Sequence, residues 1–223
     1  MKLKGVTAED FTNYKLPSLF IASAYCDWKC CKENGLEEGT CQNRPLASTE
    51  TLDVPTQTIY NLYATNDITQ AIVIGGLEPM LQFDEVLSLI KLFRDNQVAC
   101  PFVIYTGYNE SEIQNEITKL KQYNNIIIKF GRYIPTRPSR YDPILGVTLA
   151  SDNQYAVQLS KSNDQKIQKN PDAKYAQSVI DALKANDYYC PCKLEHTPDT
   201  KCMCLEFRRQ ESGMCECGLY IKG

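Results

Sequence analysis

Cysteine is the residue whose number and spacing in this sequence offer chemistry. The chain contains 11 cysteines but a single histidine, His196. An odd number of cysteines without a secretion signal argues against a disulfide scaffold and favours metal binding or redox chemistry. The single histidine nearly excludes mixed cysteine–histidine zinc sites and serine–histidine–aspartate catalysis. Ten cysteines fall in two groups, which are Cys26, Cys30, Cys31 and Cys41, and the C-x-C pairs Cys190/Cys192, Cys202/Cys204 and Cys215/Cys217.

Composition limits the class of protein. The 223 residues are 43% hydrophobic and carry a net charge of −3, so we expect one good-sized core with a small appendage and neither a nucleic-acid nor an anionic-membrane partner. No apolar run reaches the roughly 18 residues of a membrane span. The N-terminal segment turns polar and acidic within ten residues, unlike a signal peptide. These features predict a cytoplasmic protein.

The elements that must position these cysteines follow from apolar runs that alternate with helical patterns. The order βαβαβαβ favours an α/β fold with a parallel sheet and right-handed crossovers. In such sheets the chemistry lies beyond the carboxyl ends of the strands, where the first cysteine group and Gly75–Gly76 fall. The expected strands are 18–23, 71–76, 101–107 and 125–131, and the expected helices are 55–66, 83–97 and 111–123.

The C-terminal part of the chain has a different character. We expect a domain over 1–160, a polar linker over 161–172 and a small helical, cysteine-rich domain over 173–223, which opens with a helix over 173–187. The cysteine-rich tail (residues 187–220) is too poor in apolar residues to fold alone. A metal centre would supply the missing stability.

The first cysteine group has the spacing Cys26-x3-Cys30, with Cys31 next to it and Cys41 in "CQN". Three or four converging thiolates can hold a [4Fe–4S] cluster, and a zinc site or buried cysteines are the alternatives. The region resembles the radical S-adenosylmethionine (SAM) superfamily, and most closely the activating subunit of anaerobic ribonucleotide reductase. The resemblance implies Cys26, Cys30 and Cys41 as cluster ligands and Cys31 as a spare thiol, with a longer loop before the third ligand than that family has.

Further motifs over residues 15–160 agree with this resemblance. "VIGGLEPM" is similar to the family's glycine–glycine–acid motif, with Leu77 inserted, and implies that Gly75, Gly76 and Glu78 bind the methionine end of SAM. "YTGY", with Thr106, and the stretch around Asn153 are similar to later family segments and add two cofactor-binding candidates. Lys129–Phe130–Gly131 replaces the family's acid at the end of its strand. Arg132, Arg137 and Arg140 could meet an anionic partner or the carboxylate of SAM, although a solvated loop is the simpler interpretation.

The resemblance implies a function as well as a fold. The fold would be a partial (βα) barrel of radical SAM type, open on one side. A reduced [4Fe–4S] cluster would pass one electron to SAM, whose cleavage yields a 5′-deoxyadenosyl radical. That radical would take a hydrogen atom from a glycine of anaerobic ribonucleotide reductase or of another glycyl-radical protein. A ferredoxin- or flavodoxin-type protein would supply the electrons.

The tail resembles the catalytic subunit of ferredoxin–thioredoxin reductase, on the strength of "YYCPC" and "CECGLY". This resemblance implies a second [4Fe–4S] cluster beside an active-site disulfide, which would reduce a thioredoxin-like protein disulfide. Glu216 stands where that family has a histidine thought to assist proton transfer. A zinc site with two thiols left over is the alternative. The implied ligands are Cys190, Cys202, Cys204 and Cys215, and the implied redox pair is Cys192 and Cys217.

Three hypotheses follow from the sequence. The first is a radical SAM activase fused to a disulfide reductase, with two [4Fe–4S] clusters and SAM as cofactors. The second is an electron-transfer protein that relays electrons to a protein disulfide without cleaving SAM. The third is a zinc-stabilised interaction module. SAM cleavage separates the first two, and metal analysis separates the third.

Overall fold

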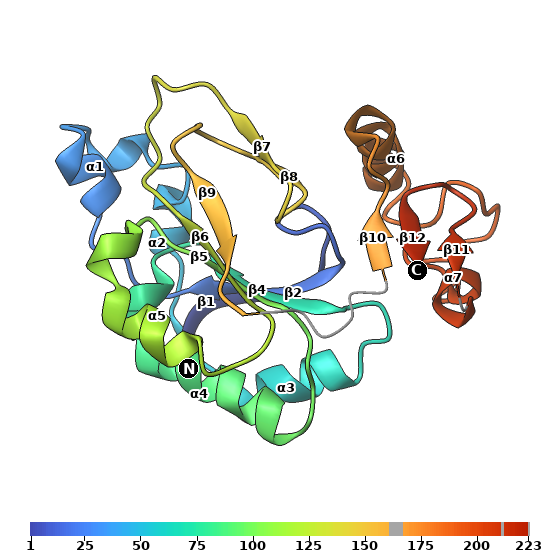
Figure 1. Cartoon of the computed structure of the whole chain (residues 1–223), viewed down its shortest axis with the longest axis horizontal. Coiled ribbons are helices and arrows are strands. Elements are labelled where there is room, and N and C mark those ends of the chain that lie inside the picture. The colour runs from blue at the N-terminus through green and yellow to red at the C-terminus, as the bar shows by residue number, and fades with distance from the viewer. Residues whose placement is uncertain (161–166, 211, 223) are drawn as a thin grey trace.

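The computed structural model describes residues 1–160, 167–210 and 212–222. Its largest feature is a seven-stranded sheet with the strand order β3-β1-β2-β4-β5-β6-β9 (Figure 1). Strands β2, β4, β5 and β6 are parallel, whereas β1, β3 and β9 at the edges each pair antiparallel with the neighbouring strand. The strands are β1 (Lys2–Asp10), β2 (Ser18–Ser23), β3 (Leu52–Asp53), β4 (Ala71–Gly75), β5 (Phe102–Tyr105), β6 (Ile126–Phe130) and β9 (Tyr155–Gln158).

The four parallel strands confirm the four strands predicted from apolar runs. Each is buried on nearly its whole length, as parallel strands covered on both faces are. The antiparallel edges differ from the wholly parallel sheet that we expected. β1 escapes detection because its sequence, KLKGVTAED, mixes lysines, glycine and acids without a two-residue alternation. The sheet is therefore mixed.

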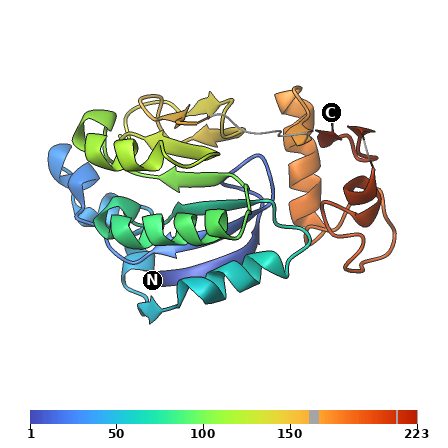
Figure 2. The same ribbon diagram turned by 60° about the horizontal axis from the view of Figure 1, so that its bottom comes forward.

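Helices cover one face of the sheet, as Figures 1 and 2 show. They confirm the three helices predicted in this part of the chain, with ends that differ by a few residues. Helix α4 has the strongest apolar stripe, and Leu89 and Phe93 on it are fully buried against the sheet. The helices are α3 (Thr56–Ala64), α4 (Phe83–Asp95) and α5 (Gln114–Leu120).

A β-hairpin contributes to the cover of the opposite face. Its strands are β7 (Arg140–Asp142) and β8 (Val147–Leu149), and Leu145 in its turn is fully buried in the apolar cluster of that face. The Asp142 carboxylate accepts hydrogen bonds from the backbone N–H groups of Leu145 and Ala156, at 3.0 and 2.9 Å. Because Ala156 belongs to β9, the hairpin is tied to the main sheet.

The C-terminal module (described residues within 167–222) combines helices with a small sheet. Helix α6 (Ala173–Ala185) confirms the predicted helix, and α7 (Leu205–Arg209) follows within the tail. Three strands in the order β10-β12-β11 complete the module, so it is not purely helical as expected. Residues 161–166 of the expected linker lie outside the described residues, and residues 167–169 form β10 instead of linker. The strands are β10 (Ile167–Lys169), β11 (Gly213–Met214) and β12 (Tyr220–Lys222).

The C-terminal module shares an apolar cluster with the part of the chain that carries the seven-stranded sheet. Phe11 stacks on Tyr188 with ring centroids 4.7 Å apart, and both belong to a cluster that contains Ile68 and five of the tail cysteines. Glu9 forms an ion pair with Lys201 across the same seam. In the described part of the chain no helix is long and apolar enough to cross a membrane.

Candidate functional site

A cavity of about 480 Å³ lies beyond the carboxyl ends of the parallel strands. Residues from the loops after β2, β4, β5 and β6 line it, as expected for this class of sheet. All four cysteines of the first group reach it, namely Cys26, Cys30, Cys31 and Cys41. The structure therefore brings together thiols that are up to fifteen positions apart in the sequence.

Two short helices position these thiols. Cys26 lies just past β2, and its sulfur accepts a hydrogen bond from the Trp28 backbone N–H at 3.4 Å. Trp28 has a positive φ of 58°, which turns the chain into α1 (Lys29–Glu33), and α1 carries Cys30 and Cys31. A 3-10 helix, η1 (Glu38–Thr40), delivers Cys41.

The thiols of this group differ in burial. Cys31 is 4% exposed, whereas Cys26, Cys30 and Cys41 are partly exposed. Burial raises the pKa of Cys26 to about 12 and also raises the pKa of Cys30 and of Cys31. Cys31 and Cys41 both line the cavity, so the choice of Cys41 as the third ligand stays a prediction.

Gly76 makes the sharp turn after β4 that opens the cavity. Its φ is +77°, and a Cβ at this position would lie 2.9 Å from Leu46 Cδ2 and 3.3 Å from the Ala22 backbone. Gly76 lines the cavity, whereas Gly75 does not and instead packs against Tyr105 and Phe20. Only the second glycine of the pair is thus placed to approach a ligand.

Glu78 is buried at the cavity wall and is already engaged by the protein. Thr106 Oγ1 and the Met80 backbone N–H donate to Glu78 Oε1 at 2.7 and 3.0 Å, and the Gly107 N–H donates to Oε2 at 2.8 Å. The side chain ties the end of β4 to the end of β5. Burial raises its pKa in spite of these donors. Glu78 and Thr106, both predicted to bind a cofactor, line the cavity but are hydrogen-bonded to each other.

Asn153, the remaining predicted cofactor residue, is outside the cavity lining. Its side-chain amide donates to the Arg132 carbonyl at 2.8 Å, and its Oδ1 atom is buried without a hydrogen-bond partner. The neighbouring Gln154 lines the cavity instead and donates to the Gly131 carbonyl. The polar side chain that this loop offers to a ligand is therefore Gln154, one position after the predicted Asn153.

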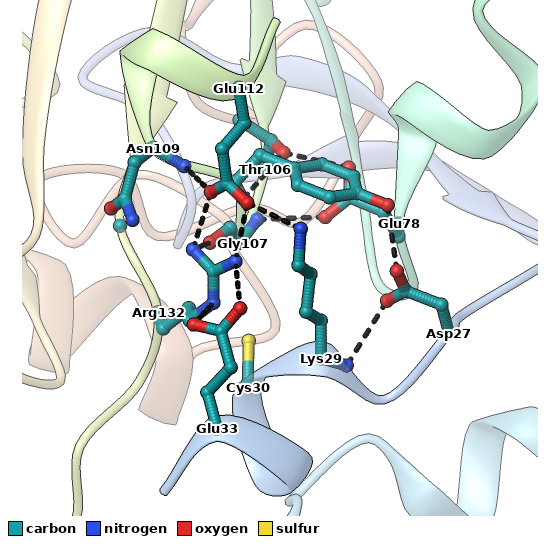
Figure 3. A network of polar contacts seen from close by, with 12 residues as sticks. Asp27, Lys29, Cys30, Glu33, Glu78, Thr106, Gly107, Asn109, Glu112 and Arg132 are labelled. Atoms are coloured by element: carbon teal, nitrogen blue, oxygen red, sulfur yellow. Dashed lines mark hydrogen bonds and ion pairs between the residues drawn. The ribbon is translucent and has the colours of Figure 1, made fainter.

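A network of ion pairs ties the cysteine loop (residues 26–41) to segments that follow β5 and β6 (Figure 3). Arg132 is 5% exposed, and its guanidinium binds both carboxylate oxygens of Glu112, at 2.7 and 2.8 Å, and both of Glu33, at 2.7 and 2.8 Å. Lys29 also pairs with Glu112, and Tyr108 donates to Asp27 at 2.7 Å. The solvated-loop interpretation of Arg132 is wrong.

Two further residues, Gly107 and Lys129, lie at the cavity wall. Gly107 lies so close to Cys30 that a Cβ added to the glycine would be 2.7 Å from the sulfur. Lys129 is a buried cation that lines the cavity, and its ammonium donates to the Gly131 carbonyl at 3.0 Å. Burial lowers the pKa of Lys129 to about 8. The sequence held one signal for Lys129, because Lys129–Phe130–Gly131 stands where the resembling family has an acid. A cation therefore takes the place of a carboxylate at this wall.

The tail thiols form a second centre. Five of them are buried around Phe207 and Tyr220, and Cys192 alone is exposed. Cys215 and Cys217 have their sulfurs 3.5 Å apart, and Cys215 also accepts a hydrogen bond from the Tyr220 N–H at 3.1 Å. Hydrogen bonds from Cys204 and Cys217 lower the pKa of Cys190. The buried five are Cys190, Cys202, Cys204, Cys215 and Cys217.

Both centres offer the kind of ligand that an iron–sulfur cluster takes. Among the described residues, no group of three or more histidine, cysteine or acidic side chains is placed so that it could hold a metal ion. The fit rests on chemistry, because thiolates are the ligands that iron–sulfur clusters take and both centres are rich in them. The two cysteines of the implied redox pair differ in exposure, because Cys192 is exposed and Cys217 is buried. Glu216 is half-exposed and pairs with Lys193 at 2.6 Å.

Comparison with known proteins bears on the first centre. Residues 19–154 match the family described as "4Fe-4S single cluster domain", which is more than half of the chain and includes the whole cysteine loop. No curated protein and no solved structure matches the chain.

Proposed function

Since the chain belongs to the 4Fe-4S single cluster domain family, we propose that it is a radical SAM enzyme with a partial-barrel fold. Its activity would be the reductive cleavage of SAM, used to generate a glycyl radical on anaerobic ribonucleotide reductase or a similar protein. The observation that carries the proposal is the convergence of four cysteines on a cavity at the carboxyl ends of parallel strands. A volume of about 480 Å³ suits a small-molecule ligand.

Different residues of the cavity would bind the cluster and SAM. Cys26, Cys30 and Cys41 would hold the cluster through their thiolates. When bound, a reduced [4Fe–4S] cluster supplies the single electron that breaks a carbon–sulfur bond of SAM. The turn at Gly76 lets the backbone approach the methionine end of SAM, and Lys129 offers a cation to its carboxylate. Because both oxygens of Glu78 already accept hydrogen bonds, its main part is to hold the ends of β4 and β5 in register.

The tail would add a disulfide reductase. Cys190, Cys202, Cys204 and Cys215 would hold a second cluster, and Cys192 with Cys217 would form the redox pair. The exposure of Cys192 supports this role, since a thiol that attacks a partner disulfide must be accessible. A ferredoxin- or flavodoxin-type protein would supply electrons, and a thioredoxin-like protein disulfide would receive them. Glu216, held by Lys193 beside this pair, is the candidate for proton transfer.

The test is anaerobic reconstitution followed by analysis of iron, sulfide and 5′-deoxyadenosine after addition of SAM and dithionite. We expect about eight irons per chain and formation of 5′-deoxyadenosine. Cys30→Ser should abolish 5′-deoxyadenosine, and Cys100→Ser, outside both cysteine groups, should not. Zinc in place of iron would refute the redox function of both centres.

A second candidate function is favoured by the saturation of Glu78. With three donors already on its carboxylate, Glu78 leaves little capacity for the ammonium of SAM. An electron-transfer protein that serves a disulfide without cleaving SAM would not need that capacity. About eight irons without 5′-deoxyadenosine in the same assay would select this alternative.

A further inference from the structure

The two thiol centres lie at opposite ends of the central sheet. In Figures 1 and 2 the helix of the cysteine loop, α1, and the C-terminal module are on opposite sides of the parallel strands. The cysteines of the cavity follow β2 and Gly76 follows β4, although Thr12 and Asn13, which precede β2, also line the cavity. The tail instead meets residues that precede the same strands, such as Phe11 and Ile68.

The separation follows from strand geometry. Met203, which lies between two tail cysteines, has its sulfur 4.0 Å from the Gln70 side-chain amide. Gln70 immediately precedes β4, and Gly76 at the cavity immediately follows it. A strand rises about 3.3 Å per residue, so this path alone spans about 20 Å. Electron tunnelling falls off exponentially with distance, which makes direct transfer over such a gap slow.

Contacts on several sides fix the C-terminal module in this position. Lys201 pairs with Glu9, and Arg208 lies 3.7 Å from Asp67. Lys169 donates to the Gly146 carbonyl of the hairpin at 2.7 Å. Together with the stacked rings of the apolar seam, these contacts join the module to the ends of β1 and β4 and to the hairpin. A swing of the tail towards the cavity would break all of them.

We infer that the two centres do not exchange electrons directly, and that each is served by its own partner at its own end of the sheet. This inference uses the proposed redox function of the tail. Reduction of one tail disulfide to two thiols takes two electrons and two protons. Under this arrangement both electrons come from a one-electron donor that acts twice at the tail, and none comes from the cavity.

The experiment compares the wild-type chain with the double variant Cys26→Ser/Cys30→Ser, which lacks the thiols of the cavity. Both are oxidised, then reduced anaerobically with dithionite-reduced methyl viologen. Free thiols of the tail are alkylated at intervals and counted by peptide mass. We expect the rates of tail reduction to agree within about twofold. A decrease of tenfold or more in the double variant would overturn the inference.

A second variant guards against a folding defect. Cys41→Ser changes a partly exposed residue of the loop and should also leave the rate unchanged. If either variant slows tail reduction while keeping the wild-type circular dichroism spectrum, electrons reach the tail through the cavity and the inference fails. Because the readout is the thiol state of the tail, it does not depend on SAM cleavage. A wild-type chain that forms no 5′-deoxyadenosine would count against the proposed function alone.

Discussion

Replacement of Arg132 by methionine should destabilise the protein because this buried guanidinium holds the cysteine loop. It makes four charge-assisted contacts of 2.7–2.8 Å with Glu33 and Glu112. Removing one partner of a fully buried ion pair costs about 3–5 kcal/mol. The carboxylates here are partly exposed, with side-chain exposures of 46% for Glu33 and 23% for Glu112. Water can therefore solvate these carboxylates when they lose their arginine partner. We therefore expect a loss of about 2–3 kcal/mol in the free energy of unfolding.

Urea unfolding under anaerobic conditions measures this loss. The matched control is Arg137→Met, because Arg137 makes an ion pair of 2.5 Å with Asp152 at a half-exposed position. Exposed pairs contribute about 0–1 kcal/mol, so the control should differ little from the wild type. The loop should also open more readily, which predicts faster alkylation of Cys30 in Arg132→Met. Equal stabilities of the two variants would refute the claim that Arg132 clamps the loop.

Three further predictions concern pH, a glycine and the iron content. Arg132 and then Lys29 hold the pKa of Glu112 below its usual value of about 4.3, so its stabilising effect is full above that pH and is lost as the pH falls below it. Glu112→Gln should therefore flatten the fall in unfolding free energy between about pH 5 and pH 3, and an unchanged slope would contradict this. Gly76→Ala should weaken SAM binding at least about tenfold in calorimetry, because a Cβ at its positive φ would meet Leu46 and Ala22 and shift the turn at the cavity. Gly39→Ala, with open space around it, should not. Cys202→Ser/Cys204→Ser should lower the iron content from about eight to about four per chain and keep SAM cleavage, and complete loss of iron would argue against two independent clusters.

The sequence predicts the centre of the fold well because its signals there are local. Short apolar runs mark the four parallel strands, and periodic patterns mark α4 and α6. The placement of the first cysteine group at the cavity could also be predicted, since a residue that follows a parallel strand must emerge at the carboxyl edge of the sheet. The same reasoning places Gly76 and Glu78 there.

The remaining features depend on contacts between distant residues, which a single sequence does not specify. The pairing of Lys2–Asp10 with β2 is set by tertiary structure, because its own residues have no strand pattern. Arg132 looks like a loop arginine until Glu33 and Glu112 are brought to it from two other elements. Glu78 looks like a ligand-binding carboxylate in the sequence, but two of its three hydrogen-bond donors, Thr106 and Gly107, follow β5 and lie beyond the motif that suggested its role.

The anchoring of the hairpin by Asp142 has a consequence for how the first centre is assembled. Residues of β8 wall one side of the cavity, and the carboxylate of Asp142 ties them to β9. With that wall fixed, access to the cavity depends on the cysteine loop, which the ion pair between Glu33 and Arg132 holds in place. Iron, sulfide and a small ligand would then all enter where this loop opens. We expect a bound ligand to block this route, so that a chelator removes iron more slowly from the liganded protein than from the ligand-free protein.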